Sequence, residues 1–154
     1  MNVSYRPLNP MDYPFIKELL PLAITTDTTG IVASNTDNGE VLAIFVCQDW
    51  TPTSVQVHQA ILNPMVLRHG YFEECAYYIF TLAGRLKMYG LVPDNNKKAL
   101  SVNEKIGFKE IARLEDACDV GVDYILMELK RDECVYWKPA SQKAALMGVS
   151  VVNP

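Results

Sequence analysis

The stretch from residue 54 to residue 114 places two helices between three short β runs, and this order limits the fold more than any other feature. "SVQVHQAIL" (54–62) alternates polar and apolar residues over most of its length, which predicts a strand. "RLKMYGLVP" (85–93) and "FKEIARL" (108–114) predict two more strands, and helical spacing predicts helices over 63–84 and 95–106. A chain with this order is expected to form a mixed α/β structure.

The rest of the sequence adds strands on both sides of this stretch. "VSYRPL" (3–8), "GIVASNT" (30–36), "EVLAIFVCQDW" (40–50) and "DYILMELK" (123–130) read as strands, and 11–20 reads as a helix. The second to fourth strands are expected to form an antiparallel meander, and the last two to pair antiparallel. The predicted order is β-α-β-β-β-α-β-α-β-β, with a domain over 1–130 and a C-terminal arm over 131–154, where the pattern weakens.

Local signals set the helix ends. Asp12 is the expected cap of helix 11–20, and Asn63 with Pro64 the expected start of helix 63–84, which we expect to point its N-terminus at an open cleft. The buried stripe of helix 11–20 should be Phe15, Ile16, Leu19 and Leu20. The stripe of helix 63–84 should be Tyr71, Cys75, Tyr78, Ile79 and Leu82.

Composition excludes several classes of function. The net charge is −4, which argues against nucleic acid as the main partner. No apolar run is long enough to span a membrane, and the first residues lack the apolar segment of a secretory signal. The four cysteines form no CxxC pair, so we expect reduced thiols in a cytoplasmic protein, and they lack metal-site spacing with His58 or His69.

One residue of helix 95–106 breaks its apolar face. Asn103 lies four residues after Ala99 and three before Ile106, so it should point inward with them. Gly107 follows where a helix commonly ends, and Phe108 starts the next strand.

With this element order, the spacing of Asn96, Ala99, Gly107 and Phe108 resembles the GCN5-related N-acetyltransferase (GNAT) superfamily over about residues 3–130. The resemblance implies an α/β (α+β) fold with a mixed, mostly antiparallel sheet and helices on both faces. It also places Asn103 where many members have a tyrosine that protonates the leaving thiolate. An amide can donate a hydrogen bond there but cannot supply a proton.

"RHGYF" (68–72) matches the acetyl-coenzyme A loop of that superfamily, with Gly70 at its first glycine. Leu67 stands where glutamine or arginine is usual, and Phe72 where a second small residue is usual. The resemblance implies acetyl-CoA as cosubstrate, held by Leu62, Arg68, His69, Gly70, Tyr71, Phe72 and Asn96. The alternative for the loop is a capped helix with a chance glycine and basic neighbours.

His58 is the expected base that deprotonates the acceptor amine, since its pKa would lie near the working pH. The alternative is a half-buried sheet histidine bonded to its neighbours, and the alternative for Asn103 is a bond to a nearby backbone group. Asp49 and Glu73 are further candidates for the base.

Two functions follow from the resemblance. The first is an acetyl-CoA-dependent N-acetyltransferase acting on a small-molecule or protein amine. The second is a GNAT-fold protein without catalysis, because the chain also looks like small GNAT-like proteins of tailed phages. That reading implies a structural or head-assembly role in the host cytoplasm or virion, with phage head proteins or further copies of the chain as partners.

Overall fold

The computed structural model describes residues 1–139, and residues 140–154 of the predicted arm lie outside them. One seven-stranded sheet has the order β1-β2-β3-β4-β5-β7-β6. Its strands are β1 (Val3–Pro7), β2 (Thr29–Asn35), β3 (Val41–Gln48), β4 (Ser54–Ile61), β5 (Lys87–Pro93), β6 (Lys109–Asp119) and β7 (Val122–Lys130). Every neighbouring pair is antiparallel except β4 and β5, which are parallel. The predicted mixed sheet, its meander and its antiparallel last pair are confirmed.

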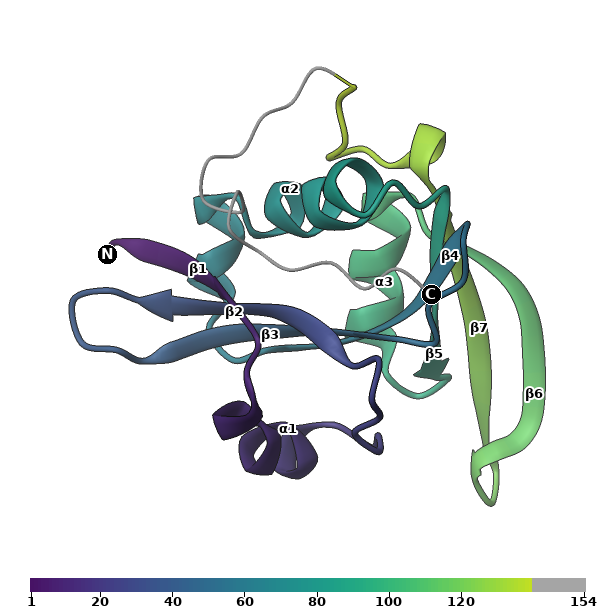
Figure 1. Ribbon diagram of the computed structural model, residues 1–154. Coiled ribbons are helices and arrows are strands. Elements are labelled where there is room, and N and C mark those ends of the chain that lie inside the picture. The colour runs from purple at the N-terminus through teal and green to yellow at the C-terminus, as the bar shows by residue number, and fades with distance from the viewer. Residues whose placement is uncertain (140–154) are drawn as a thin grey trace.

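Helices lie on both faces of the sheet, as predicted (Figure 1). α1 (Tyr13–Leu19) covers one face, where Ile16 packs on Ile44 and Val46 of β3. α2 (Tyr71–Ala76) and α3 (Lys97–Ile106) lie on the other, over the main core. That core includes Tyr71, Cys75, Tyr78 and Ile79, four of the five residues predicted for the apolar stripe, all buried; Leu82 is partly buried against it.

The predicted helix 63–84 is divided into three parts. A 3₁₀ turn (Pro64–His69) ends at Gly70, whose φ of 78° is left-handed; α2 then begins, and it continues as a π-helix, η3 (Tyr77–Leu82). Asn63 caps the 3₁₀ turn as predicted, since its side chain accepts a bond from the Met65 amide. The expectation of one helix from Pro64 is wrong, because the left-handed residue ends the first turn and restarts the helix in a new direction.

Two other boundaries also differ from prediction. Asp12 does not cap α1; it accepts two hydrogen bonds from Arg6, and together with Asn9 it forms a capping box on a 3₁₀ turn (Pro10–Asp12). Of the stripe expected on helix 11–20, Ile16 is buried, Leu19 and Leu20 are partly buried against the same cluster, and Phe15 is exposed. β6 runs on to Asp119, past the predicted end at residue 114: its register with β7 shifts after Leu114 and resumes at Asp119, which pairs with Val122.

The segment Arg131–Pro139, here called the C-terminal strap, packs back over α2 and α3. The amide of Val135 donates to the carbonyl of Ile106 at 2.9 Å. Trp137 donates from Nε1 to Thr81 Oγ1 at 3.1 Å, and Tyr136 stacks on Phe72 at 5.3 Å between ring centroids. The strap therefore closes the outer side of the space between the two helices. Whether it is an arm separate from a domain over 1–130 stays a prediction.

Candidate functional site

The two parallel strands separate in the middle of the sheet. β4 and β5 pair only over Ser54–Gln56 and Lys87–Tyr89, although both strands continue for several residues beyond. At the point of separation Gly90 lies so close to β4 that an added Cβ would be 2.9 Å from the Val57 carbonyl oxygen. Since the strands then diverge, the sheet carries a notch lined by backbone that has no strand partner.

This notch opens into a cavity of about 590 Å³ between the sheet and its helices. Its walls come from both sides of the sheet: α1 and the residues after it, β4, β5, β7, α2, α3 and the strap. The wall includes Leu20, Gln56, His58, Gln59, Phe72, Cys75, Asn96, Asn103, Tyr124 and Cys134.

The alternation of β4 makes the cavity accessible from both faces of the sheet. His58 lies opposite Val46, which packs under α1, whereas Gln59 lies opposite Phe45, which belongs to the core under α2. Directly opposed residues of an antiparallel pair share a face, so His58 faces α1 and Gln59 faces α2. Tyr71 of α2 donates a 3.1 Å hydrogen bond to Gln59 Oε1, which confirms that orientation.

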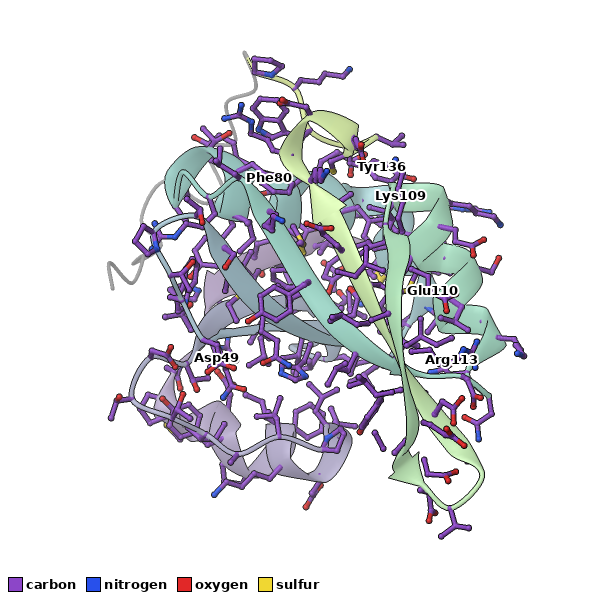
Figure 2. All side chains as sticks on the ribbon, turned by 90° about the vertical axis from the view of Figure 1, so that its right-hand side faces the viewer. Asp49, Phe80, Lys109, Glu110, Arg113 and Tyr136 are labelled. Atoms are coloured by element: carbon purple, nitrogen blue, oxygen red, sulfur yellow. The ribbon has the colours of Figure 1, made fainter. Side chains whose placement is uncertain are left out.

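His58 is half-buried on the α1 side, as the alternative reading expected, but it also lines the cavity. Burial lowers the pKa of His58, and the negative charge of Asp49 opposes this effect. Asp49 follows β3 with a left-handed φ of 55°, on the side of the sheet that carries α1 (Figure 2). The lowered pKa keeps the imidazole neutral at pH 7, the state in which it can accept a proton.

Asn103 points inward, as predicted, and lines the cavity from α3 with 9% of its surface exposed. Within residues 1–139 its side chain makes one hydrogen bond, a long one of 3.7 Å from Nδ2 to Met127 Sδ. It therefore does not follow the alternative reading, in which it bonds a backbone group. A thioether is a weak acceptor, so the amide keeps most of its hydrogen-bonding capacity for a ligand.

The start of α2 is acidic. Glu73 and Glu74 lie in its first turn, and Glu73 Oε2 is buried without a hydrogen-bond partner in the described part of the chain. Their carboxylates suit the positive end of the helix, but they oppose a second anion there. The neighbouring basic residues Arg68 and His69 are exposed.

The residues predicted to hold the carrier divide into three groups. Phe72 and Asn96 line the cavity with His58 and Asn103. Leu62 lies outside it, 42% exposed, and its amide donates to the Leu42 carbonyl. Arg68, His69, Gly70 and Tyr71 form the loop behind the wall, where Tyr5 fixes the loop by donating to the His69 carbonyl at 2.6 Å.

Several cavity residues were not predicted from the sequence. Gln56 is two residues before His58 on a strand that alternates, so the sequence could have predicted that both lie on the same face. Cys75 was predicted to be buried but not to line a site. Cys134 reaches the cavity only because the strap folds back, and the sequence carries no local signal for that contact.

Residues 1–139 contain neither a metal-binding cluster nor a membrane-spanning helix. Between residues 1 and 139, no group of three or more His, Cys, Asp or Glu side chains is placed to hold a metal ion. In the same range no helix is long and apolar enough to cross a membrane. All four cysteines are free thiols.

The fold matches that of solved N-acetyltransferase structures, in agreement with the fold that the resemblance to the GNAT superfamily predicted. No family model matches the sequence, and no curated protein matches it. Among solved structures, the spermidine/spermine N-acetyltransferase SpeG from Vibrio cholerae, in complex with manganese ions, has a TM-score of 0.71 at 16% identity, covering 84% of this chain and 93% of that chain. A mutant form of the same enzyme has a TM-score of 0.73 at 16% identity, covering 88% and 97%. A chimera of Vibrio cholerae SpeG with hSSAT gives 0.67 at 18% identity, covering 86% and 98%.

Proposed function

We propose that this protein is an N-acyltransferase that takes an acyl group from an acyl-coenzyme A and delivers it to a primary amine of a small molecule. The observation that carries the proposal is the notch between β4 and β5. It opens into a cavity with a neutral base, His58, on one face of the sheet and an amide donor, Asn103, on the other. The similar SpeG structures are those of spermidine/spermine N-acetyltransferases, which supports an amine acceptor.

The interior of the cavity fits the apolar part of such a carrier. Its wall holds no Asp, Glu, Lys or Arg side chain from residues 1–139, and the separated strands offer backbone groups to a carbonyl. Phosphate recognition would rest on Arg68 and the first amides of α2, beside the negative charge of Glu73. The carrier supplies a thioester, whose C–S bond breaks as the amine nitrogen bonds to the carbonyl carbon and the electron pair leaves on sulfur.

The chain's own residues would act from opposite sides of the sheet. On the α1 side, His58 accepts the proton that the amine must lose to become a nucleophile. On the α2 side, Asn103 donates a hydrogen bond to the sulfur that leaves, while a proton comes from solvent. Placing both groups around one notch brings the reactants into contact, which is itself a large part of catalysis.

Calorimetric titration with CoA and acetyl-CoA tests the carrier site. We expect binding, and we expect Arg68→Ala to weaken it by about 1–3 kcal/mol, because a charged hydrogen-bond donor is lost. Lys105→Ala, which removes an exposed charge from the last turn of α3, is the matched control. If the wild-type chain binds CoA and Arg68→Ala binds equally well, the phosphate site is misplaced.

A second function is favoured by one group of contacts at the start of α2. Glu73 and Glu74 occupy the helix end, and Phe72, stacked on Tyr136, fills the position where the superfamily has a small residue. These features suit a GNAT-fold protein without catalysis that serves as a structural or assembly protein, in a phage head or as a homo-oligomer. Failure of the wild-type chain to bind CoA or turn over a panel of amines would favour this function.

A further inference from the structure

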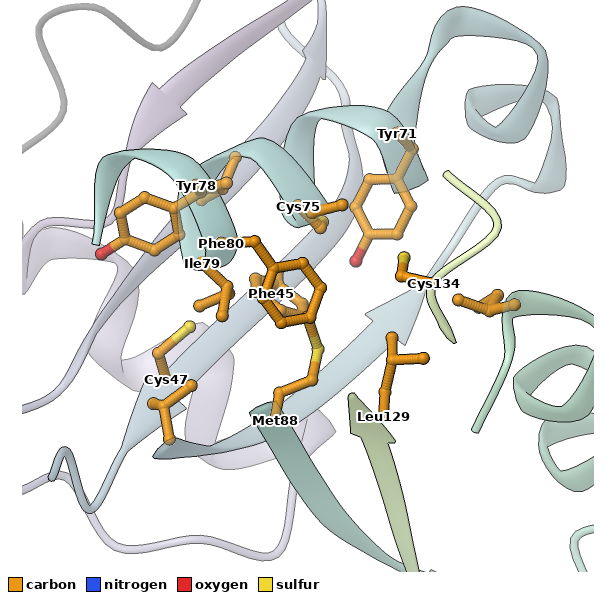
Figure 3. Packing of buried hydrophobic residues seen from close by; sticks show 14 of the residues in the cluster. Phe45, Cys47, Tyr71, Cys75, Tyr78, Ile79, Phe80, Met88, Leu129 and Cys134 are labelled. Atoms are coloured by element: carbon orange, nitrogen blue, oxygen red, sulfur yellow. The ribbon is translucent and has the colours of Figure 1, made fainter. Parts of the chain in front are cut away.

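The part of the cavity on the α2 and α3 side of the sheet, here called its inner half, has a mostly apolar wall, with Gln59 and Asn103 as polar side chains. Buried apolar residues from three strands, α3 and the segment after it line this part: Phe45, Met88, Ile106, Phe108, Met127 and Leu129. Asn103 is the one buried polar side chain among the described cavity residues. Figure 3 shows Phe45, Met88 and Leu129 turned towards Cys75 of α2 and Cys134 of the strap.

This space is much larger than an acetyl group requires. The whole cavity measures about 590 Å³, within the range of about 300–1,000 Å³ that accommodates drug-sized ligands. Taking ~30 Å³ for a group the size of a water molecule, even half of this volume would hold roughly ten such groups. An acetyl group would leave most of that volume unfilled, and a dry apolar wall forms few favourable contacts with water.

The inner half also has a definite end. Cys134 lines it with 8% exposure, and the strap is fixed there by the bond from the Val135 amide to Ile106. The same cavity includes the notch with His58. A ligand entering through the notch would therefore extend as a chain away from the reacting centre and stop at the strap.

We propose that the inner half of the cavity binds a linear, medium-length acyl chain of roughly eight carbons, so that the transferred group is a medium-chain acyl group and not acetyl. As an assignment of the donor this rests on the proposed function, but the apolar site itself can be tested without it. Each methylene moved from water into such a wall improves affinity by roughly three- to fourfold.

The test measures binding by calorimetry for CoA, acetyl-CoA and octanoyl-CoA, and separately for free decanoate. We expect octanoyl-CoA to bind at least about tenfold more tightly than acetyl-CoA, and decanoate to bind without any CoA. Equal or weaker binding of octanoyl-CoA overturns the chain site while leaving the proposed function intact. Binding of decanoate with no binding of any thioester overturns the proposed function and keeps the apolar site, whereas no binding of either overturns both.

Two cavity-filling variants test whether the acyl chain binds in the inner half of the cavity. Cys134→Leu and Ala76→Leu each add bulk to the wall from a different element, so one can replace the other if either fails to fold. Both should remove most of the advantage of octanoyl-CoA over acetyl-CoA. Cys118→Leu, outside the cavity on β6, is the matched control and should keep it. If octanoyl-CoA keeps its advantage over acetyl-CoA in both folded filling variants, the acyl chain binds elsewhere and the proposal is overturned.

Discussion

At the scale of single residues, the amide of Asn103 is the group with the most unused capacity. Its Nδ2 reaches only the weak acceptor Met127 Sδ among the described residues, although the residue is buried. Buried polar groups without good partners cost stability, so a ligand that bonds this amide recovers part of that cost. Asn103 is therefore better suited to a binding site than to holding α3 in place.

We expect Asn103→Tyr to raise the rate of acyl transfer by roughly tenfold or more, because a phenol at that position can protonate the leaving thiolate. The cavity beside residue 103 provides room for the ring, which limits overpacking to about 1–3 kcal/mol. Turnover of acetyl-CoA with a panel of amines measures the effect. Ser101→Tyr, on the exposed side of the same helix, is the control. Equal rates in Asn103→Tyr and an active wild type would mean that solvent alone protonates the thiolate.

A second prediction concerns pH. His58 accepts a proton only when neutral, so the rate should fall as the pH drops through its pKa. Asp49 raises that pKa against the effect of burial, and Asp49→Asn should therefore move the acidic limb of the rate profile to lower pH. Asp37→Asn, in the exposed turn before β3, should not move it. The same shift can be followed by NMR of the His58 ring if turnover is slow; movement to higher pH would show that Asp49 acts through structure.

At the scale of elements, the start of α2 carries competing charges. Glu73 and Glu74 lie where phosphate oxygens would meet the helix dipole. Glu73→Gln should strengthen CoA binding by roughly 0.5–1.5 kcal/mol, because it removes the repulsion between this carboxylate and the phosphate oxygens at the start of the helix. Calorimetry compares it with Glu104→Gln on the exposed side of α3. Weaker binding in Glu73→Gln would show that the carboxylate positions the loop and does not repel the ligand.

The elements also show where prediction from sequence succeeds and fails. The end of α3 at Gly107 and its inward Asn103 follow from local spacing, and the structure has both. The division of helix 63–84 at Gly70 does not follow, because apolar spacing continues across the break while the backbone turns left-handed. The prediction ended β6 too early because residues 115–119 carry no apolar alternation, and the strand continues only through a register shift, after which Asp119 pairs with Val122.

At the scale of the whole molecule, the strap and α3 meet at a contact that tolerates no side chain. A Cβ on Gly107, where φ is 122°, would lie 2.4 Å from the Glu133 carbonyl oxygen. Gly107→Ala should therefore destabilise the protein by about 3 kcal/mol or more and weaken protection of the Val135 amide against hydrogen exchange.

Gly39→Ala separates backbone strain from this collision. Gly39 has a left-handed φ of 76° with nothing within 4 Å of an added Cβ, so its substitution should cost only about 1–2 kcal/mol. Urea denaturation gives both costs. If the two variants lose the same stability, the strap does not press on α3 as described.

The order of elements predicted a mixed α/β structure, and the resemblance that this order supports predicted a mostly antiparallel sheet with helices on both faces, as the structure has. The element order alone did not show that Cys134 and Tyr136 return to the site, because their contacts with α2 lie about sixty residues away along the chain. At the scale of the whole molecule, the resemblance and the structure agree on the fold. The set of residues that line the cavity, in contrast, is brought together by tertiary packing.

The place of β7 between β5 and β6 sets the order in which the chain can fold. β5 and β6 are both made before β7, yet neither pairs with the other, so each keeps an open edge until residues 122–130 are synthesised. On the ribosome, the β1–β4 meander can form early through local pairing, whereas the β5–β7–β6 half closes last. During that interval the edge of β5 is the part of the nascent chain most exposed to pairing with another chain, and a chaperone that shields it would act there.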